Sequence, residues 1–392
     1  MVTPSYAFSR CPRILFGEGA FGRLGEITAG FGPVALLVTG GGSLERSGRL
    51  DALLSSLSDR SVRCEMVAVA GEPSPEMVDG AVAAHRGRAV SVVLAVGGGS
   101  VMDAGKAVSA MLPMEGPVLE YLEEVGDPSA HSGAKVPFIA APTTAGTGSE
   151  ATRNAVLSRT GPKGFKVSLR HDEFVPDVAV VDPSLALSCP AGTTAACGMD
   201  AFTQLLESLV SPAASPITDA LALSGFERVR DSLVSAFTSG ASDIEARAGM
   251  AYAALVSGLA LANAGLGVVH GLAASVGGKF DVPHGVACGT LVGPATRANI
   301  LRLREAGGEE ALLKYAMAGA AVTGRAGESA ENLCDLLVEV IDRWVEELRI
   351  PRLGRYGITE SDLDSLAAST AQKSNPVALS LNEVRGILAA RL

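Results

Sequence analysis

Short runs of β-branched and apolar residues alternate with longer amphipathic stretches through the first half of the chain, and this alternation restricts the fold more than any other feature. It is typical of a parallel sheet, because parallel neighbours need a crossover connection, usually a helix. The runs that we interpret as strands cover residues 34–39, 64–70, 90–96, 138–141 and 178–181. The sequence therefore predicts an N-terminal α/β domain with a parallel, Rossmann-like sheet.

The pattern changes after Asp182 and Pro183. From about Gly192 onward Ala and Leu recur at helical spacing, β-branched runs nearly vanish, and Ser215 followed by Pro216 is a helix-start signal. A chain of 392 residues also exceeds the roughly 250–300 residues at which a single hydrophobic core stops growing. We therefore expect two domains, residues 1–187 with the sheet and residues 188–392 all-helical, with ligands bound between them at the carboxyl ends of the strands.

Charge and cysteine content restrict the partners. The net charge is −10 and no cluster of Lys and Arg is present, which argues against a nucleic-acid surface. The six cysteines are scattered without a CxxC pair, and no secretory signal is visible, so we expect a cytoplasmic protein. Residues 248–278 lack Asp, Glu, Lys and Arg and could span a bilayer of ~30 Å. Because this run contains seven glycines, Asn263 and His270, we expect buried core helices and no membrane partner.

Three consecutive glycines, Gly97, Gly98 and Gly99, follow the predicted strand at 90–96 and open a helix at Ser100. Glycines at such a junction let backbone N–H groups approach a pyrophosphate, and the helix N-terminus adds partial positive charge. The segment is not a GxGxxG fingerprint, however, and a tight turn without a ligand would use the same glycines. From these residues alone, the phosphate-binding and the purely structural interpretations stay equally open.

Three motifs in one order resemble those of the iron-containing (group III) alcohol dehydrogenases: VGGGSVMDAGK at 96–106, APTTAGTGSE at 141–150 and HGLAASVGGKFDVPHG at 270–285. The resemblance extends from FGEGAFGRL near the start to SNPVALSLNEVRGIL near the end. It implies a dehydroquinate synthase-like fold, with a dinucleotide-binding domain at 1–187 and a helical metal- and substrate-binding domain at 188–392. The cofactor-binding residues that it implies are Gly97, Gly98, Gly99, Ser100, Asp103, Thr143, Thr144, Thr147, Ser149 and Lys166. For Lys166, a solvated lysine in a hairpin is the alternative.

A second glycine cluster, Gly40, Gly41 and Gly42, ends the strand at 34–39. Many NAD-preferring members of the family have an Asp just after this strand, which accepts a hydrogen bond from the ribose 2′-OH and would repel a 2′-phosphate. Gly40 stands at that position here, and VTGGGSLERSG resembles the NADP-using branch, with Arg46 as a possible added charge. The resemblance therefore implies NADP(H) in preference to NAD(H), with Gly40 and Gly41 as further cofactor-binding residues.

Members of the family hold a divalent metal with an Asp and a His four residues apart on one helix and with two later histidines. The matching residues are Asp200, Gln204, His270 and His284, so an amide replaces the first imidazole. Ala274, one helical turn after His270, is a second departure, because the family commonly has another histidine there. An amide oxygen is a poorer donor than imidazole for Fe²⁺ or Zn²⁺, so we expect Gln204 to be a weak fourth ligand.

Three interpretations of the chemistry follow. In the first, a metal-assisted, NAD(P)-dependent dehydrogenase moves a hydride between the cofactor and a small alcohol, aldehyde or ketone, with Asp200, His270 and His284 as catalytic residues. In the second, the enzyme is a metal-independent reductase resembling maleylacetate reductase, in which a histidine polarises or protonates the carbonyl and Asp200 orients it. In the third, the chain is an inactive nucleotide-binding protein. The resemblance favours the first, acting as a homodimer.

The substrate pocket is predicted to be lined by the helix face around Phe202, Leu205 and Leu206 and by residues 273–278. Alanine at position 274, in place of the histidine common in the family, would enlarge that pocket. This favours a bulkier substrate.

Overall fold

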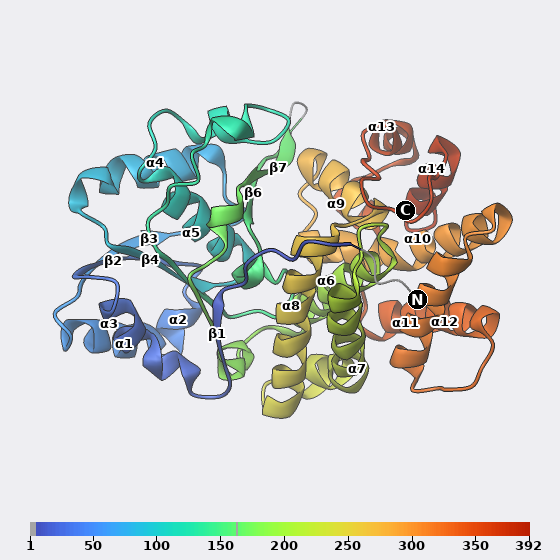
Figure 1. Ribbon diagram of the computed structural model, residues 1–392, viewed down its shortest axis with the longest axis horizontal. Helices are drawn as coiled ribbons and strands as arrows, with labels where there is room; N and C mark the ends of the chain where they lie inside the picture. The colour runs from blue at the N-terminus through green and yellow to red at the C-terminus, as the bar shows by residue number, and fades with distance from the viewer. Residues whose placement is uncertain (1–4, 162–163) are drawn as a thin grey trace.

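The computed structural model describes residues 5–161 and 164–392 and places a parallel sheet beside a large helical region (Figure 1). The six parallel strands have the order β1-β8-β5-β4-β2-β3, and a separate antiparallel hairpin joins β6 and β7. Their bounds are β1 Arg13–Phe16, β2 Val34–Thr39, β3 Arg63–Ala68, β4 Val92–Gly97, β5 Phe138–Pro142, β6 Asn154–Arg159, β7 Phe165–Arg170 and β8 Val178–Val181. The five predicted strands are confirmed, and the bounds of β2 and β8 agree with the prediction.

Helices cover both faces of the sheet. They are α1 Leu24–Ala29, α2 Ser43–Arg46, α3 Arg49–Ser58, α4 Pro75–His85 and α5 Gly99–Met111. Alternate residues of β2 contribute to two separate cores: Leu36 and Val38 pack in the core that includes α4 and α5, whereas Ala35 and Leu37 pack in the core that includes α1 and α3. Burial on both faces explains why the central strands are continuous apolar runs.

The second half of the chain is helical, as predicted. Its helices are α6 Ala191–Val210, α7 Pro216–Ser239, α8 Ile244–Ala264, α9 Val268–Lys279, α10 His284–Ala306, α11 Glu309–Thr323, α12 Ala330–Glu347, α13 Leu363–Ala368 and α14 Leu381–Ala389. The helix-start signal is confirmed, because Ser215 caps α7 in a capping box with Thr218. The sheet thus ends at Val181 and the long helices begin at Ala191; the division into domains at 1–187 and 188–392 stays a prediction.

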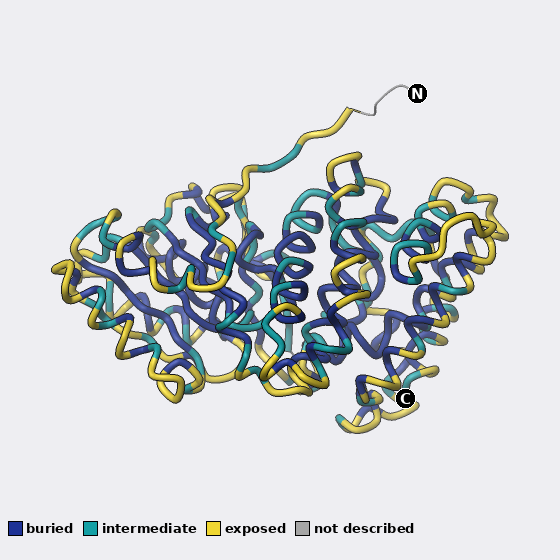
Figure 2. Tube along the Cα trace, turned by 90° about the horizontal axis from the view of Figure 1, so that it is seen from below, coloured by how far each residue is buried: buried dark blue, intermediate teal, exposed yellow. Residues whose placement is uncertain are grey.

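One helix in the described part of the chain, Ile244–Ala264, is long and apolar enough to cross a membrane. In the structure 67% of the apolar 18-residue stretch of this helix is buried, and the helix packs against α6 and α7. Figure 2 shows buried residues through the middle of the molecule and exposed residues along its outer edges. This agrees with the interpretation of residues 248–278 as core helices.

The loop that follows β5 joins the sheet to the helices. Gly148 has φ of +60°, and a Cβ there would lie 2.6 Å from the carbonyl oxygen of Ala254 in α8. A Cβ at Gly146 would lie 2.8 Å from Cβ of Cys197 in α6. Glycine is therefore needed at both positions for close packing. This contact sets the carboxyl ends of β4 and β5 against the helix that carries Asp200.

Candidate functional site

The predicted phosphate loop connects β4 to α5. Gly97 is the last residue of β4, and a Cβ there would lie 2.6 Å from the Val101 side chain. A Cβ at Gly99 would lie 2.7 Å from Cγ2 of Thr147, whereas at Gly98 the nearest atoms lie 3.4 Å away, an ordinary contact. Close packing thus explains why glycine is required at positions 97 and 99, but not at position 98. In the first turn of α5 the N–H of Val101 donates to Gly98 O at 3.0 Å, whereas the N–H groups of Gly99 and Ser100 precede the helical hydrogen-bond ladder and are available to an anion.

The side chains of Asp103, Lys106 and Ser149 fasten this loop to the APTTAGTGSE segment. Ser149 Oγ donates a 2.6 Å hydrogen bond to Asp103 Oδ1. Buried Lys106 donates from Nζ to Ser149 O at 2.8 Å, to Thr152 Oγ1 at 3.0 Å and to Asn154 O at 2.8 Å. Burial lowers the pKa of Lys106 to about 8, although Asp103 opposes the shift. The observed role of Asp103 and Ser149 is to hold the two segments together, and their contact with a cofactor stays a prediction.

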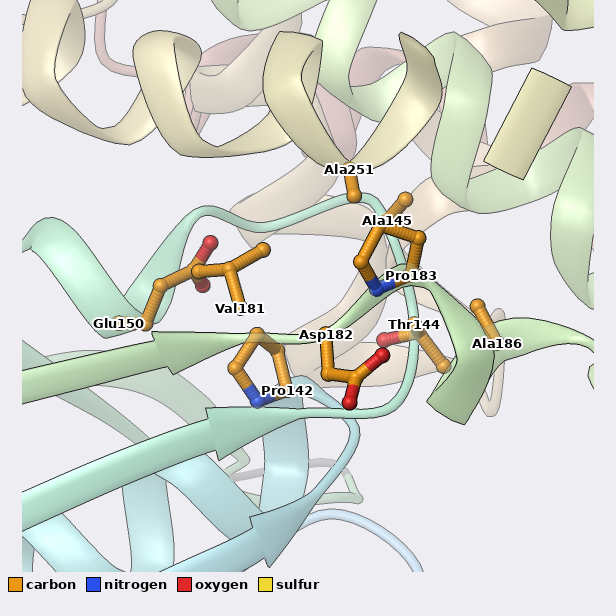
Figure 3. A pocket seen from close by; sticks show the side chains of 9 residues that line it. All are labelled: Pro142, Thr144, Ala145, Glu150, Val181, Asp182, Pro183, Ala186 and Ala251. Carbon is orange, nitrogen blue, oxygen red and sulfur yellow. The ribbon is translucent and has the colours of Figure 1, made fainter. Parts of the chain in front are cut away.

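A small pocket lies beside the APTTAGTGSE segment (Figure 3). Its lining comes from the end of β5 and the loop after it, from the end of β8 and from α8: Pro142, Thr144, Ala145, Glu150, Val181, Asp182, Pro183, Ala186 and Ala251. Its volume of ≈ 10 Å³ is about enough for one water molecule. It is therefore a gap in the packing between sheet and helices and cannot admit a nicotinamide ring.

Lys166 lies on β7 and is only 8% exposed at its side chain, so it is not a solvated hairpin lysine. Nζ of Lys166 is 2.9 Å from Glu72 Oε2. The Lys166 side chain also packs against α9, because a Cβ added at Gly277 would lie 3.3 Å from Cδ of Lys166. Burial lowers the pKa of His284 to about 4, and the positive charge of Lys166 contributes to the same shift, so this charge lies close to the histidines described below.

Three of the four predicted metal ligands converge. Asp200 comes from α6, His270 from α9 and His284 from the first residue of α10; α10 packs against both α6 and α9, and α9 packs against β7. Nε2 of His270 lies 3.5 Å from Asp200 Oδ1, and Nε2 of His284 lies 3.7 Å from the same oxygen. Asp200 is 1% exposed, and its Oδ1 has no hydrogen-bond partner among the described residues. A buried carboxylate oxygen left unpaired between two imidazoles suits a bound cation.

The charges around Asp200 also favour a cation. Burial tends to raise the pKa of Asp200, but His284 and His270 outweigh it and hold that pKa below the ordinary value. The pKa of His270 lies well above its ordinary value despite burial, because the groups around it include Cys288, Asp200 and Glu207. Burial raises the pKa of the Cys288 thiol to about 12. Asp200 therefore carries the fixed negative charge of the site.

Glu207 lies three residues after Gln204 on α6, just under one helical turn, and its carboxylate reaches α9. Its Oε2 accepts a 2.6 Å hydrogen bond from Nδ1 of His270, and its Oε1 accepts one of 2.6 Å from the backbone N–H of Val269. This bond fixes the ring so that Nε2 of His270 is directed at Asp200, and that nitrogen becomes a metal ligand once it has released its proton. Sequence reasoning missed Glu207, because only the fold brings it to His270.

The substitution Glu207→Gln is expected to weaken divalent-metal affinity roughly 10–100-fold, because a neutral amide holds the imidazole in its ligand tautomer less firmly. Competition with a chromophoric chelator measures this effect. Glu339→Gln, at an exposed position of α12, is the matched control. Unchanged affinity in Glu207→Gln would contradict the orienting role.

Gln204 is buried beside the site, but its Oε1 accepts a 2.6 Å hydrogen bond from the Ser257 hydroxyl of α8. Its role as a weak metal ligand stays a prediction. In contrast, the Cys288 sulfur joins Asp200, His270 and His284 in one group whose ligand atoms all lie within 4.8 Å of one another. Sequence reasoning missed Cys288, although its position four residues after His284 on one helix is a recognisable signal.

The prediction that Phe202, Leu205 and Leu206 line the substrate pocket is wrong. All three are buried in the helical core. Phe202 packs edge-on against Phe226 and Trp344, with ring centroids 5.6 and 5.3 Å away. The 3.6-residue period puts this face of α6 opposite α7 and α12 rather than toward a ligand.

Comparisons with known proteins cover both halves of the chain. A family model described as "Iron-containing alcohol dehydrogenase" matches residues 11–183, and one described as "Fe-containing alcohol dehydrogenase family, C-terminal" matches residues 194–392. The 1,3-propanediol dehydrogenase of Klebsiella pneumoniae is 33% identical over 366 residues, which cover 92% of this chain and 91% of that protein. The NADPH-dependent butanol dehydrogenase of Clostridium saccharobutylicum is 31% identical over 386 residues, 95% of each chain. A solved structure of 1,3-propanediol oxidoreductase matches with a TM-score of 0.87 and 31% identity, over 99% of this chain and 100% of that one.

Proposed function

Because this chain belongs to the iron-containing alcohol dehydrogenase family, and is therefore an NAD(P)-dependent alcohol dehydrogenase, we propose that it prefers NADP(H) and uses a divalent metal to interconvert small alcohols with aldehydes or ketones. The observation that carries the metal-assisted reaction is the convergence of Asp200, His270 and His284, with Asp200 Oδ1 left unpaired. In the metal-independent alternative Asp200 would orient a histidine, but Glu207 fills that role for His270.

The donor set fits a divalent cation: one carboxylate and two imidazoles with an open side are a credible catalytic metal site. When bound, the cation supplies a Lewis acid that polarises the oxygen of the substrate, and the nicotinamide supplies or accepts the hydride. Asp200, His270 and His284 would hold the cation, and Glu207 fixes the ring of His270. The first turn of α5 supplies backbone N–H groups to the pyrophosphate.

The preference for NADP(H) is supported by the turn after β2. Gly40 carries no carboxylate that would repel a 2′-phosphate, and Arg46 lies on the turn, donating from Nη1 to Gly41 O at 3.2 Å. Gly42 has φ of +84° and sits between the Glu45 and Arg46 side chains. Glu45 places a negative charge near the positive charge of Arg46 at this turn. The NADP(H) preference therefore rests more on the absence of an acid at position 40 than on the charge of Arg46.

Steady-state kinetics of metal-loaded protein with aldehydes and ketones of increasing size test this proposal. We expect turnover in the presence of a nicotinamide cofactor, with kcat/KM at least about tenfold higher for NADPH than for NADH, or about 1.4 kcal/mol. A higher kcat/KM for NADH would contradict the cofactor preference. Absence of turnover with every carbonyl compound, in protein that holds metal, would contradict the substrate class.

Ala274 lies half-buried on α9, one turn after His270 and on the same face. The substitution Ala274→His is expected to shift the preference toward short-chain alcohols by roughly tenfold, because the larger side chain takes up pocket volume. The chain-length profile of kcat/KM measures the shift. Ala274→Ser, which adds little volume, is the control, and an unchanged profile in Ala274→His would refute this expectation.

The cytoplasmic setting and the homodimer are part of the same proposal. All six cysteines are free, as a reducing compartment requires. β1 lies at one edge of the sheet and exposes Ile14 and Phe16, at 36% and 42%, which a second subunit would cover. Light scattering should give twice the mass of one chain, and a monomer at micromolar concentration would contradict the dimer.

A further inference from the structure

Two pairs of residues four apart face the candidate metal site. Asp200 and Gln204 form one pair on α6, and His284 and Cys288 form the other on α10. Gln204 directs its amide oxygen to the Ser257 hydroxyl at 2.6 Å. Cys288 is fully buried and belongs to the group that contains Asp200, His270 and His284. The donor that completes the three-residue set therefore comes from α10.

The distances in this group suit one cation. Sγ of Cys288 lies 3.7 Å from Nε2 of His270 and 3.7 Å from Nε2 of His284. Those two nitrogens lie 3.5 and 3.7 Å from Asp200 Oδ1. Ligands held at about 2.0–2.3 Å around a tetrahedral Zn²⁺ are themselves roughly 3.3–3.6 Å apart. Four of the six distances among the donor atoms are thus close to this spacing, and all six lie within 4.8 Å.

Ordinary packing of a buried thiol does not account for these contacts. Cys334, buried in the helical core, has its Sγ 3.4 Å from the backbone carbonyl of Leu312. The Cys288 sulfur is instead in contact with two imidazoles that both face an unpaired carboxylate oxygen. A core cysteine has no need of such neighbours, whereas a ligand does.

We propose that the Cys288 thiolate, in place of Gln204, is the fourth protein ligand of the metal and that this sulfur makes Zn²⁺ the preferred cation. The inference rests on the proposed metal-assisted function and specifies its site. On binding, the thiol releases its proton to solvent and the sulfur forms a bond to the cation, with no change in oxidation state. Thiolate is a soft ligand that selects zinc over the hard cations, and zinc binds more tightly than iron(II) in the general affinity order.

Cobalt(II) loading tests the ligand by spectroscopy. Cobalt bound to a thiolate gives an intense near-ultraviolet charge-transfer absorption that nitrogen and oxygen ligands do not give. We expect this band in the wild-type protein and in Cys197→Ser, whose thiol lies on α6 three residues before Asp200, and its loss in Cys288→Ser. The same Cys288→Ser variant should bind Zn²⁺ at least roughly tenfold more weakly.

Zinc-edge X-ray absorption of the wild-type enzyme decides the question even if Cys288→Ser fails to fold. One sulfur scatterer at about 2.3 Å, retained in Cys197→Ser, supports the proposal. A shell of only nitrogen and oxygen, or a cobalt spectrum without the band, overturns it. If that metal-loaded protein still reduces aldehydes with NADPH, the proposed function stands and only the Cys288 ligand is lost; if no metal binds, both fail.

Discussion

Replacing Asp200 by asparagine is expected to lower kcat by at least about a thousandfold and to remove most bound metal. Asp200 is the only carboxylate in the group of candidate ligands, and its unpaired oxygen faces both imidazoles. A Lewis acid contributes several kcal/mol of transition-state stabilisation, and each 1.36 kcal/mol is about tenfold in rate. Metal analysis and steady-state NADPH oxidation on the same preparation measure both effects.

The control for losing one negative charge is Asp231→Asn, at an exposed position of α7. It should keep wild-type metal content and turnover. Circular dichroism should show that Asp200→Asn still folds. An Asp200→Asn protein with full turnover and full metal content would show that the cation, if required, is held elsewhere.

Replacing Gly40 by aspartate is expected to remove the preference for NADPH over NADH. A carboxylate at 4 Å from another unit charge costs about 1 kcal/mol in water and about 4 kcal/mol near a partly buried surface, and a 2′-phosphate carries more than one charge. The ratio of kcat/KM for NADPH to that for NADH should therefore fall by roughly tenfold or more. Gly40 lies outside the left-handed region, so its backbone tolerates a side chain.

Gly40→Ala separates charge from volume in this test. A Cβ at position 40 lies 3.0 Å from Cγ2 of Val101, so alanine introduces the same close contact as aspartate without the charge. We expect Gly40→Ala to affect both cofactors alike. An equal loss of NADPH preference in the two variants would show that crowding against Val101, not the 2′-phosphate, explains the effect.

Local patterns were sufficient for most of the fold. The central strands are buried on both faces, so they appear in the sequence as unbroken apolar runs. The helix that begins at Pro216 could be predicted because its capping residue, Ser215, directly precedes it. β1 was missed because it is a short edge strand, largely exposed, that pairs with β8 far along the chain. The strands β6 and β7 were not predicted either: a hairpin was raised only as the alternative for Lys166, although Phe165, Val167 and Leu169 alternate with polar residues as a strand requires.

The candidate site, like the fold, was predicted only in part. Asp200, His270 and His284 were predicted from motifs, and the structure brings them together. Glu207 and Cys288 contact His270 only through the packing of α6, α9 and α10, and for Cys288 alone a local signal existed, its spacing of four residues from His284. Phe202 was assigned to the wrong side of α6, because an apolar face gives no indication of whether it meets a ligand or another helix.

Restoring turnover to metal-stripped protein tests the central claim most directly. Chelator-treated protein should be inactive with NADPH and an aldehyde, and added Zn²⁺ or Fe²⁺ should restore the rate with a break at one equivalent per chain. Metal-free protein, verified by mass spectrometry, that still reduces the aldehyde at the full rate would contradict a reaction assisted by a metal at Asp200, His270 and His284.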